Sequence, residues 1–208
     1  MNIPVVYEDE WLVVVNKPSG LLTIPTPKNE RRTLTSILND DLLERGFLYR
    51  LHPCHRLDRE TSGLIIYAKG KAVQKKMAEL FKGKEIKKTY LAFVRGAPKE
   101  ARAEIKFPIE GMQALTKYQL IKKINGFSIV KANPLTGRTN QLRIHFKQIG
   151  HPILGESKYA FRRDFSVKAK RLCLHAEDLE FTHPVTKQYL KLHADLPEDL
   201  KELLKKYD

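Results

Sequence analysis

The chain has 208 residues and a hydrophobic content of 42%, which is enough to bury a substantial core and excludes a disordered polypeptide. Lysine and arginine total 38 against 24 acids, and the resulting net charge of +14 suits a polyanionic partner such as nucleic acid. The charged surface of a thermophilic protein would explain 30% charged residues, but not so large an excess of one sign.

Cysteine content and the N-terminal residues limit the compartment. Two cysteines, Cys54 and Cys173, are too few for a disulfide framework. Acids occupy positions 8–10, where a signal peptide needs an apolar core, and no stretch approaches the ~18 uninterrupted apolar residues of a membrane span. We therefore expect a cytoplasmic protein that does not bind membranes.

The first part of the chain predicts three strands and a helix. Apolar runs at residues 5–7 and 11–15 are typical of short strands. Thr33 can cap a helix whose apolar residues recur at helical spacing as far as Gly46. The continuous apolar run 64–68 lies between glycines and predicts a strand buried on both faces.

Further strands and helices follow along the rest of the chain. Helical spacing is expected at 73–81, from Thr139 to Gly150, and after Pro197, and strand patterns are expected at 89–94, 102–107, 115–121 and 127–132. Asn125-Gly126 joins the last two strands as a hairpin turn. In the helix that starts at Thr139, Arg143 is expected to lie beside the apolar stripe, where it could reach a neighbouring acid. Together these elements predict a mixed α/β (α+β) fold in a single domain, residues 1–208.

The segment 55–63, His-Arg-Leu-Asp-Arg-Glu-Thr-Ser-Gly, places one carboxylate among cations directly before the buried strand. Asp58 would lie in a turn at the mouth of that strand, where Arg56 and Arg59 favour the ionised carboxylate. A nucleophile or general base fits this setting. On composition alone a turn residue is the more usual interpretation, because Asp followed by Thr and Ser before Gly is ordinary turn chemistry. The local pattern leaves both open.

Several motifs in a fixed order carry a resemblance to a known family. Segment 55–63 resembles the HRLDxxTSG signature of the RluA-type RNA pseudouridine synthases. Segment 87–92 is similar to the K-x-Y-x-A strand of that family, and segment 137–145, Gly-Arg-Thr-Asn-Gln-Leu-Arg-Ile-His, is similar to its GR[TS]HQ[LI]R[VI]H helix. The matches span nearly the whole chain. The S4 RNA-binding module that many relatives carry has no room here, so we expect a stand-alone catalytic domain and a monomer.

The resemblance implies a central, largely antiparallel sheet with flanking helices and an active cleft across it. It implies isomerisation of specific uridines in ribosomal or transfer RNA to pseudouridine. Asp58 would be the catalytic nucleophile or base, Tyr90 a base for the C5 proton of the flipped uracil, and Arg143 the partner of Asp58. Tyr90 has the alternative of a core aromatic, and Arg143 that of a phosphate contact.

Four further residues are expected to contact the RNA: Arg56, Lys88, Arg138 and Asn140. A structural ion pair is the alternative for Arg56. Asn140 stands where the family usually has His, and because an amide cannot ionise, its role should be hydrogen bonding. A catalytically silent RNA-binding or RNA-folding protein on the same scaffold remains the alternative to an enzyme.

Basic residues gather in two places that favour phosphate contact. Eight lysines lie between positions 69 and 88 against two acids, and five cations lie between 162 and 171 against Asp164. A solvated surface is the usual interpretation of either cluster alone. Together with the net charge they favour RNA.

Neither a metal nor a nucleotide cofactor is expected. His52, Cys54, His55, Cys173 and His175 include zinc-ligand types, but no Cys-x-x-Cys pair occurs, and the fragments that echo a zinc deaminase signature come in the reverse order. The glycines form neither a dinucleotide fingerprint nor a phosphate-binding loop.

Overall fold

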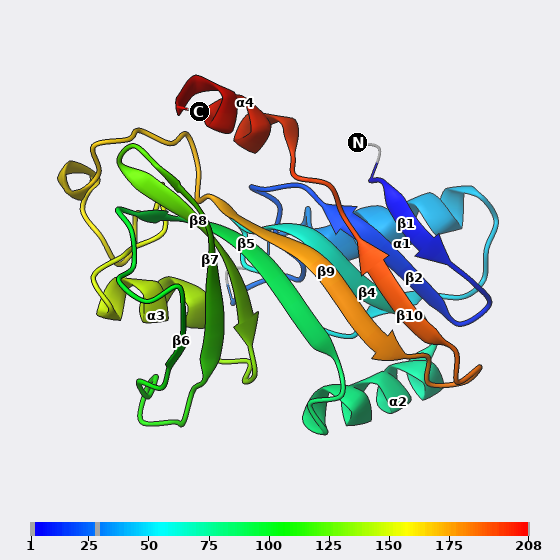
Figure 1. Ribbon diagram of the computed structural model, residues 1–208. Coiled ribbons are helices and arrows are strands. Elements are labelled where there is room, and N and C mark those ends of the chain that lie inside the picture. Colours follow the sequence, from blue (N-terminus) through cyan, green and yellow to red (C-terminus); the bar gives the residue numbers. More distant parts are fainter. Residues whose placement is uncertain (1–2, 28–29, 208) are drawn as a thin grey trace. The chain divides into compact units, whose positions relative to one another are not determined.

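The computed structural model describes residues 3–27 and 30–207, and Figure 1 shows its helices and strands. The chain divides into two compact units. The first unit comprises Met1–Ile86 and Asp178–Ala194, and the second comprises Lys87–Glu177 and Asp195–Asp208. Each unit therefore consists of two separate stretches of sequence. The expected single domain over residues 1–208 stays a prediction, since two compact units in one chain can unfold together or separately.

The first unit is an antiparallel sheet with two helices. Its helices are α1 (Leu34–Glu44) and α2 (Lys71–Lys82), and its strands are β1 (Val5–Glu8), β2 (Leu12–Lys17), β3 (Leu51–Pro53), β4 (Ser62–Lys69) and β10 (Tyr189–His193). β2 pairs with β1 and β4, and β3 also pairs with β4, all antiparallel. As expected from its continuous apolar run, β4 is buried from Ser62 through Ala68.

The helix α1 begins where the sequence predicts. Thr33 Oγ1 accepts a hydrogen bond from Ser36 N at 3.2 Å, and Ser36 Oγ accepts one from Thr33 N at 2.9 Å, which completes a capping box. Leu34 and Leu42 are buried in the core of the first unit, and Arg45 ends the helix before Gly46. The capping prediction for Thr33 is confirmed.

The second unit also consists of antiparallel strands with helices. Its elements are β5 (Lys87–Arg95), β6 (Arg102–Ile105), β7 (Thr116–Ile124), β8 (Phe127–Pro134), α3 (Gln141–Gln148), the 3-10 turn η1 (Arg162–Asp164) and α4 (Glu198–Tyr207). β8 pairs with β5 and β7, and β7 pairs with β6, all antiparallel. The predicted turn at 125–126 joins β7 to β8, with Gly126 at φ +85°. Its core includes Phe93, Phe127, Phe146 and Leu200 of α4.

The mixed α+β class with largely antiparallel strands is confirmed, and three strands are additions to the expectation. These are β3, β10 and β9 (Leu174–Thr182), whose first residues belong to the second unit and whose last residues pair with β10 in the first. α3 begins at Gln141 rather than Thr139, because Asn140 adopts a left-handed conformation at φ +53°. Within residues 3–27 and 30–207, no helix has the length and apolar character to cross a bilayer.

Candidate active site

Asp58 lies half-buried in the loop between β3 and β4, and the segment after β2 holds this loop by its backbone. Thr23 Oγ1 donates to Leu57 O at 3.0 Å and accepts from Leu57 N at 3.2 Å. Gly20 N donates to Arg59 O at 2.8 Å, and Ser19 Oγ donates to Glu60 O at 2.6 Å. Because the residues on both sides of Asp58 are fixed, the position of its Cα is fixed as well.

A buried lysine completes this support. Lys17 is fully buried, and its Nζ donates to Leu21 O at 2.7 Å, Pro18 O at 2.9 Å and Arg59 O at 3.2 Å. A buried ammonium is costly unless such acceptors surround it. From the sequence, residues 16–20 are expected to break the chain after the second strand, with no role for Lys17. A lysine just after the apolar run 11–15, next to Pro-Ser-Gly, was the available signal.

The rest of the Asp58 motif forms the turn into β4. Thr61 N donates to Asp58 O at 3.1 Å, and Ile66 N donates to His55 Nε2 at 3.0 Å. Arg56 is exposed, and Arg59 Nη2 lies 3.6 Å from Glu30 Oε1. Backbone atoms thus close a turn at Asp58, and this leaves both the catalytic and the turn interpretation of its carboxylate open.

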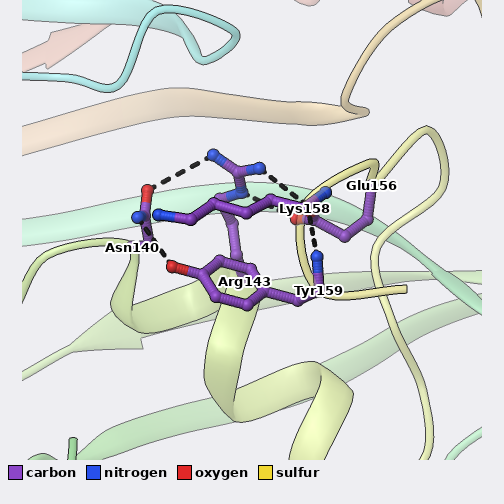
Figure 2. Close-up of polar contacts among 5 residues, drawn as sticks. All are labelled: Asn140, Arg143, Glu156, Lys158 and Tyr159. Atoms are coloured by element: carbon purple, nitrogen blue, oxygen red, sulfur yellow. Dashed lines mark hydrogen bonds and ion pairs between the residues drawn. The ribbon is translucent and has the colours of Figure 1, made fainter. Parts of the chain in front are cut away.

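In the second unit, Arg143 of α3 is buried and forms a two-pronged ion pair with Glu156, as Figure 2 shows. Arg143 Nε donates to Glu156 Oε2 at 2.6 Å, and Nη2 donates to Oε1 at 2.7 Å. The side chain of Arg143 is 9% exposed and that of Glu156 is 0% exposed, and Glu156 is the kind of neighbouring acid that Arg143 was expected to reach. Sequence reasoning did not single out Glu156.

Glu156 stays ionised in spite of its burial. Burial alone raises the pKa of a carboxyl, but the hydrogen bond from Arg143 and those from Lys158 N at 2.7 Å and Tyr159 N at 3.2 Å outweigh it, so the pKa of Glu156 lies below its usual value. Charge-assisted hydrogen bonds of this kind are strong and directional. The carboxylate therefore fixes the plane of the Arg143 guanidinium.

Asn140 occupies the position before α3 and hydrogen-bonds on both sides (Figure 2). Its Oδ1 accepts from Arg143 Nη1 at 3.3 Å, and its Nδ2 donates to the Tyr159 hydroxyl at 2.8 Å. The Arg143 guanidinium also lies over the Tyr159 ring, 5.5 Å from its centroid. Asn140 thus acts by hydrogen bonding, as expected for an amide. Its predicted contact with RNA stays a prediction.

The remaining candidates of the second unit lie on β5 and before α3. Tyr90 and Lys88 are two residues apart on β5 and so share a face, and both are half-buried. Burial lowers the pKa of Lys88. Asn133 Nδ2 donates to Lys88 O at 2.9 Å, which ties β5 to β8 here. Arg138 Nε donates to Gln113 O at 3.1 Å.

The structure places Asp58 and Arg56 in the first unit, and the other five candidates in the second. Within the second unit, it brings Arg143 and Asn140 into direct contact. The pairing of Asp58 with Arg143 joins residues of different units and stays a prediction.

Most of the first lysine cluster faces solvent. Six of its members are exposed: Lys71, Lys75, Lys76, Lys82, Lys84 and Lys87. In the second cluster, Arg171 pairs with Asp199 of α4 and Arg163 lies over the Phe161 ring, whereas the Arg162 side chain lies outside the described part of the structure. Lys168 and Lys170 of the second cluster are exposed as well, so the first cluster differs in having more exposed lysines.

The candidate metal ligands do not gather into a site in the part of the chain that the structure describes, where no three His, Cys, Asp or Glu side chains could hold an ion. Burial raises the pKa of Cys54 and of Cys173 to about 12. Both sulfurs therefore stay as thiols, which are poor metal ligands and poor nucleophiles.

Comparison with known proteins places the chain among enzymes that modify RNA. The profile of the RNA pseudouridylate synthase family matches residues 11–148. A dual-specificity RNA pseudouridine synthase RluA from Pasteurella multocida is 37% identical over 208 residues, and the match covers 92% of each chain. A tRNA pseudouridine synthase C from Vibrio cholerae is 32% identical and covers 99% of this chain and 96% of its own.

A solved structure agrees with these sequence matches. Human RNA pseudouridylate synthase domain containing 4 superposes with a TM-score of 0.81 at 25% identity, covering 99% of this chain and 94% of its own. The fold and the sequence thus both match RNA pseudouridine synthases.

Proposed function

The chain belongs to the RNA pseudouridylate synthase family, and on that premise we propose that it isomerises uridines in ribosomal or transfer RNA to pseudouridine, with Asp58 as the catalytic carboxylate. In this reaction the N1–C1′ bond breaks, the uracil turns, and C5 joins C1′. No atoms are gained or lost, so the chemistry needs an aimed carboxylate and a base for the C5 proton.

The observation that carries the proposal is the fixed loop around Asp58. Lys17, Gly20 and Thr23 bind the backbone of the residues on either side of it. A reacting group held to within a fraction of an ångström gains much of its rate from orientation alone. An ordinary surface turn has no need of a fully buried lysine beneath it.

Tyr90 and Arg143 take the two other roles. A half-buried tyrosine offers a flat ring against a flipped base and a polar tip for its proton. Arg143 would pair with Asp58 and keep it ionised. Arg56, Lys88, Arg138 and Asn140 would contact the RNA, together with the exposed lysines of α2.

The partner that fits is a compact RNA stem-loop whose target uridine leaves its stack. Extrusion of a base costs a few kcal/mol, which basic and aromatic contacts can offset. The enzyme would act as a cytoplasmic monomer and without a cofactor.

Tritium release from C5-labelled uridine in RNA tests the proposal. Asp58→Asn keeps the shape of the side chain and removes its charge, so turnover should fall by about 10³-fold or more. RNA affinity should change by less than about twofold, because phosphate contacts dominate it. Asp40→Asn, at an exposed position of α1, is the matched control and should leave the rate unchanged.

Three results would contradict the proposal. Full activity of Asp58→Asn would remove Asp58 from the mechanism, and unfolding would make it a turn residue. If the unaltered protein bound RNA tightly but released no tritium from any cellular RNA fraction, the catalytically silent RNA-binding protein would be the correct interpretation.

A further inference from the structure

Arg143 is held by a set of contacts that fixes its direction. An arginine has five N–H donors in a planar fork. Glu156 takes the pair formed by Nε and Nη2, and Asn140 accepts from Nη1. Because the guanidinium is planar, these contacts also fix the direction in which its terminal Nη1–Nη2 edge points.

The backbone at Glu156 is held as firmly as its side chain. Gly155 is at φ +76°, and a Cβ there would collide with the backbone carbonyl of Arg171, so no other residue fits without moving the chain. Glu156 then accepts from Lys158 N and Tyr159 N. The carboxylate of Glu156 therefore binds Arg143 from a backbone position that is itself fixed.

Stability alone does not explain a buried ion pair. Taking two charges out of water offsets most of their attraction, and well-packed apolar residues often serve a fold equally well. Phosphate binding does not explain it either. The Arg143 side chain is only 9% exposed, so it offers little surface to a phosphate.

We propose that Glu156 is a positioning residue, which fixes the direction of the terminal edge of the Arg143 guanidinium for the reaction. Asn140 and the Tyr159 ring complete this clamp. Glu156 acts through Arg143 and touches neither the RNA nor the reacting atoms. The inference rests on the proposed function, since it requires Arg143 to take part in the reaction.

Single-turnover rates on saturating RNA, measured beside RNA affinity, test the inference. Glu156→Gln removes the charge and sets an amide against the Arg143 donors, so the rate should fall by about 10- to 100-fold while the dissociation constant stays within about twofold. Glu156→Asp keeps the charge on a shorter side chain and should recover part of the rate.

A matched control removes a similar two-bond arginine–carboxylate ion pair at another place in the second unit. Asp199 of α4 accepts from Arg171 Nε at 2.5 Å and from Arg171 Nη2 at 2.9 Å. Asp199→Asn should lower the melting temperature and leave the single-turnover rate unchanged. If Glu156 were only structural, both variants would behave in this way.

Removing one partner of a buried pair can unfold a protein, so a gentler variant is needed as well. Asn140→Gly keeps the left-handed backbone, which glycine adopts without strain, and deletes only the side chain that contacts Arg143 and Tyr159. Its single-turnover rate should fall by about 3- to 10-fold. In an Arg143→Lys background, neither Glu156→Gln nor Asn140→Gly should reduce the rate further.

The inference is overturned if folded Glu156→Gln or Asn140→Gly keeps the original rate, or if only RNA affinity falls. It is also overturned if the losses add to that of Arg143→Lys. If the unaltered protein releases no tritium, the proposed function fails first. If the unaltered protein is active and the Glu156 and Asn140 variants keep its single-turnover rate, the proposed function stands and only the positioning role of Glu156 fails.

Discussion

Lys17 and Arg143 are both buried cations, and the protein satisfies them in different ways. Lys17 donates to carbonyl oxygens of two loops, whereas Arg143 meets a carboxylate. An ammonium is a compact charge with rotatable donors and suits scattered carbonyls, while the planar guanidinium suits a carboxylate. Lys17 thereby fixes the position of a loop, whereas the Arg143 side chain is fixed by Glu156.

Replacing Lys17 with Met should lower the free energy of unfolding by about 3 kcal/mol, because the side chain keeps its length but its three acceptors lose a charged donor. Urea unfolding measures the change. Lys76→Met, at an exposed position of α2, should stay within about 0.5 kcal/mol. Equal effects of the two substitutions would mean that the buried ammonium does not support the Asp58 loop.

Two buried histidines should make the stability depend on pH. Burial lowers the pKa of His183 and of His145. His183 Nδ1 accepts from Val185 N and Thr186 N, so a proton there would break both bonds. Below about pH 6.5 the unfolded chain takes up protons that the folded chain refuses, so stability is complete above this pH and falls as the pH drops toward the lower folded pKa values.

The free energy of unfolding should therefore fall between pH 7 and pH 5.5, by at most about 1.4 kcal/mol per pH unit for each histidine. Carboxyl groups titrate nearer pH 4, so this window belongs to the histidines. Urea midpoints at half-unit pH steps measure it. A flat profile in that window would mean that neither histidine is kept neutral by folding.

The sequence located the Asp58 motif, Arg143 and Asn140, but not the partners that hold them. Motifs report residue types at fixed spacing, and Glu156 stands outside the predicted helix as one acid among 24. The helical spacing indicated that Arg143 could reach a neighbouring acid, but not which one. Amphipathic spacing placed Arg143 at the edge of the stripe, and tertiary packing then covered it.

At the scale of elements, strong local sequence signals were enough to predict a helix start, a strand or a turn. The Thr33 cap, the apolar run of β4 and the Asn125-Gly126 turn are each decided by neighbouring residues. β3 and β10 have three and five residues, and short strands gain their order from the strand they pair with. Nothing local distinguishes such segments from loops.

The helix α2 begins with a lysine that does not serve the stability of the helix. Its N-cap, Gly70, makes no side-chain cap, its first turn has no acid, and Lys71 lies at the positive end of the helix dipole. Such charges are unfavourable for the helix and favourable for a phosphate. Lys71→Glu should therefore raise the free energy of unfolding by about 0.3–1 kcal/mol and weaken RNA binding.

The salt dependence of RNA affinity tests the same helix. Replacing Lys71, Lys75 and Lys76 with Gln should lower the slope of log K against log salt by about 0.7–0.9 for each phosphate that these lysines no longer neutralise. Replacing Lys201, Lys205 and Lys206 of α4 removes the same charge and should change the slope less. Equal slopes for the two triple variants would assign the effect to net charge rather than to an α2 surface.

At the scale of the whole molecule, the chain passes from one unit to the other and back. The first unit takes Asp178–Ala194 from late in the sequence, and the second takes Asp195–Asp208 after it. Neither unit can be cut out as one continuous piece. This interleaving is a feature of the complete chain that no motif reports, and it favours the single domain expected from the sequence.

Residues 1–86 alone should consequently fail to fold. That fragment lacks β10 and the core residues Leu179, Phe181, Leu190 and Ala194, which pack with Leu64, Ile66 and Met77 in one cluster. Losing several buried side chains at about 2–5 kcal/mol each exceeds the roughly 5–15 kcal/mol that a domain has. Circular dichroism should show no cooperative melting for the fragment, while the full chain should melt in one calorimetric transition. A fragment that melts cooperatively, or a full chain with two separate transitions, would divide residues 1–208 into two domains.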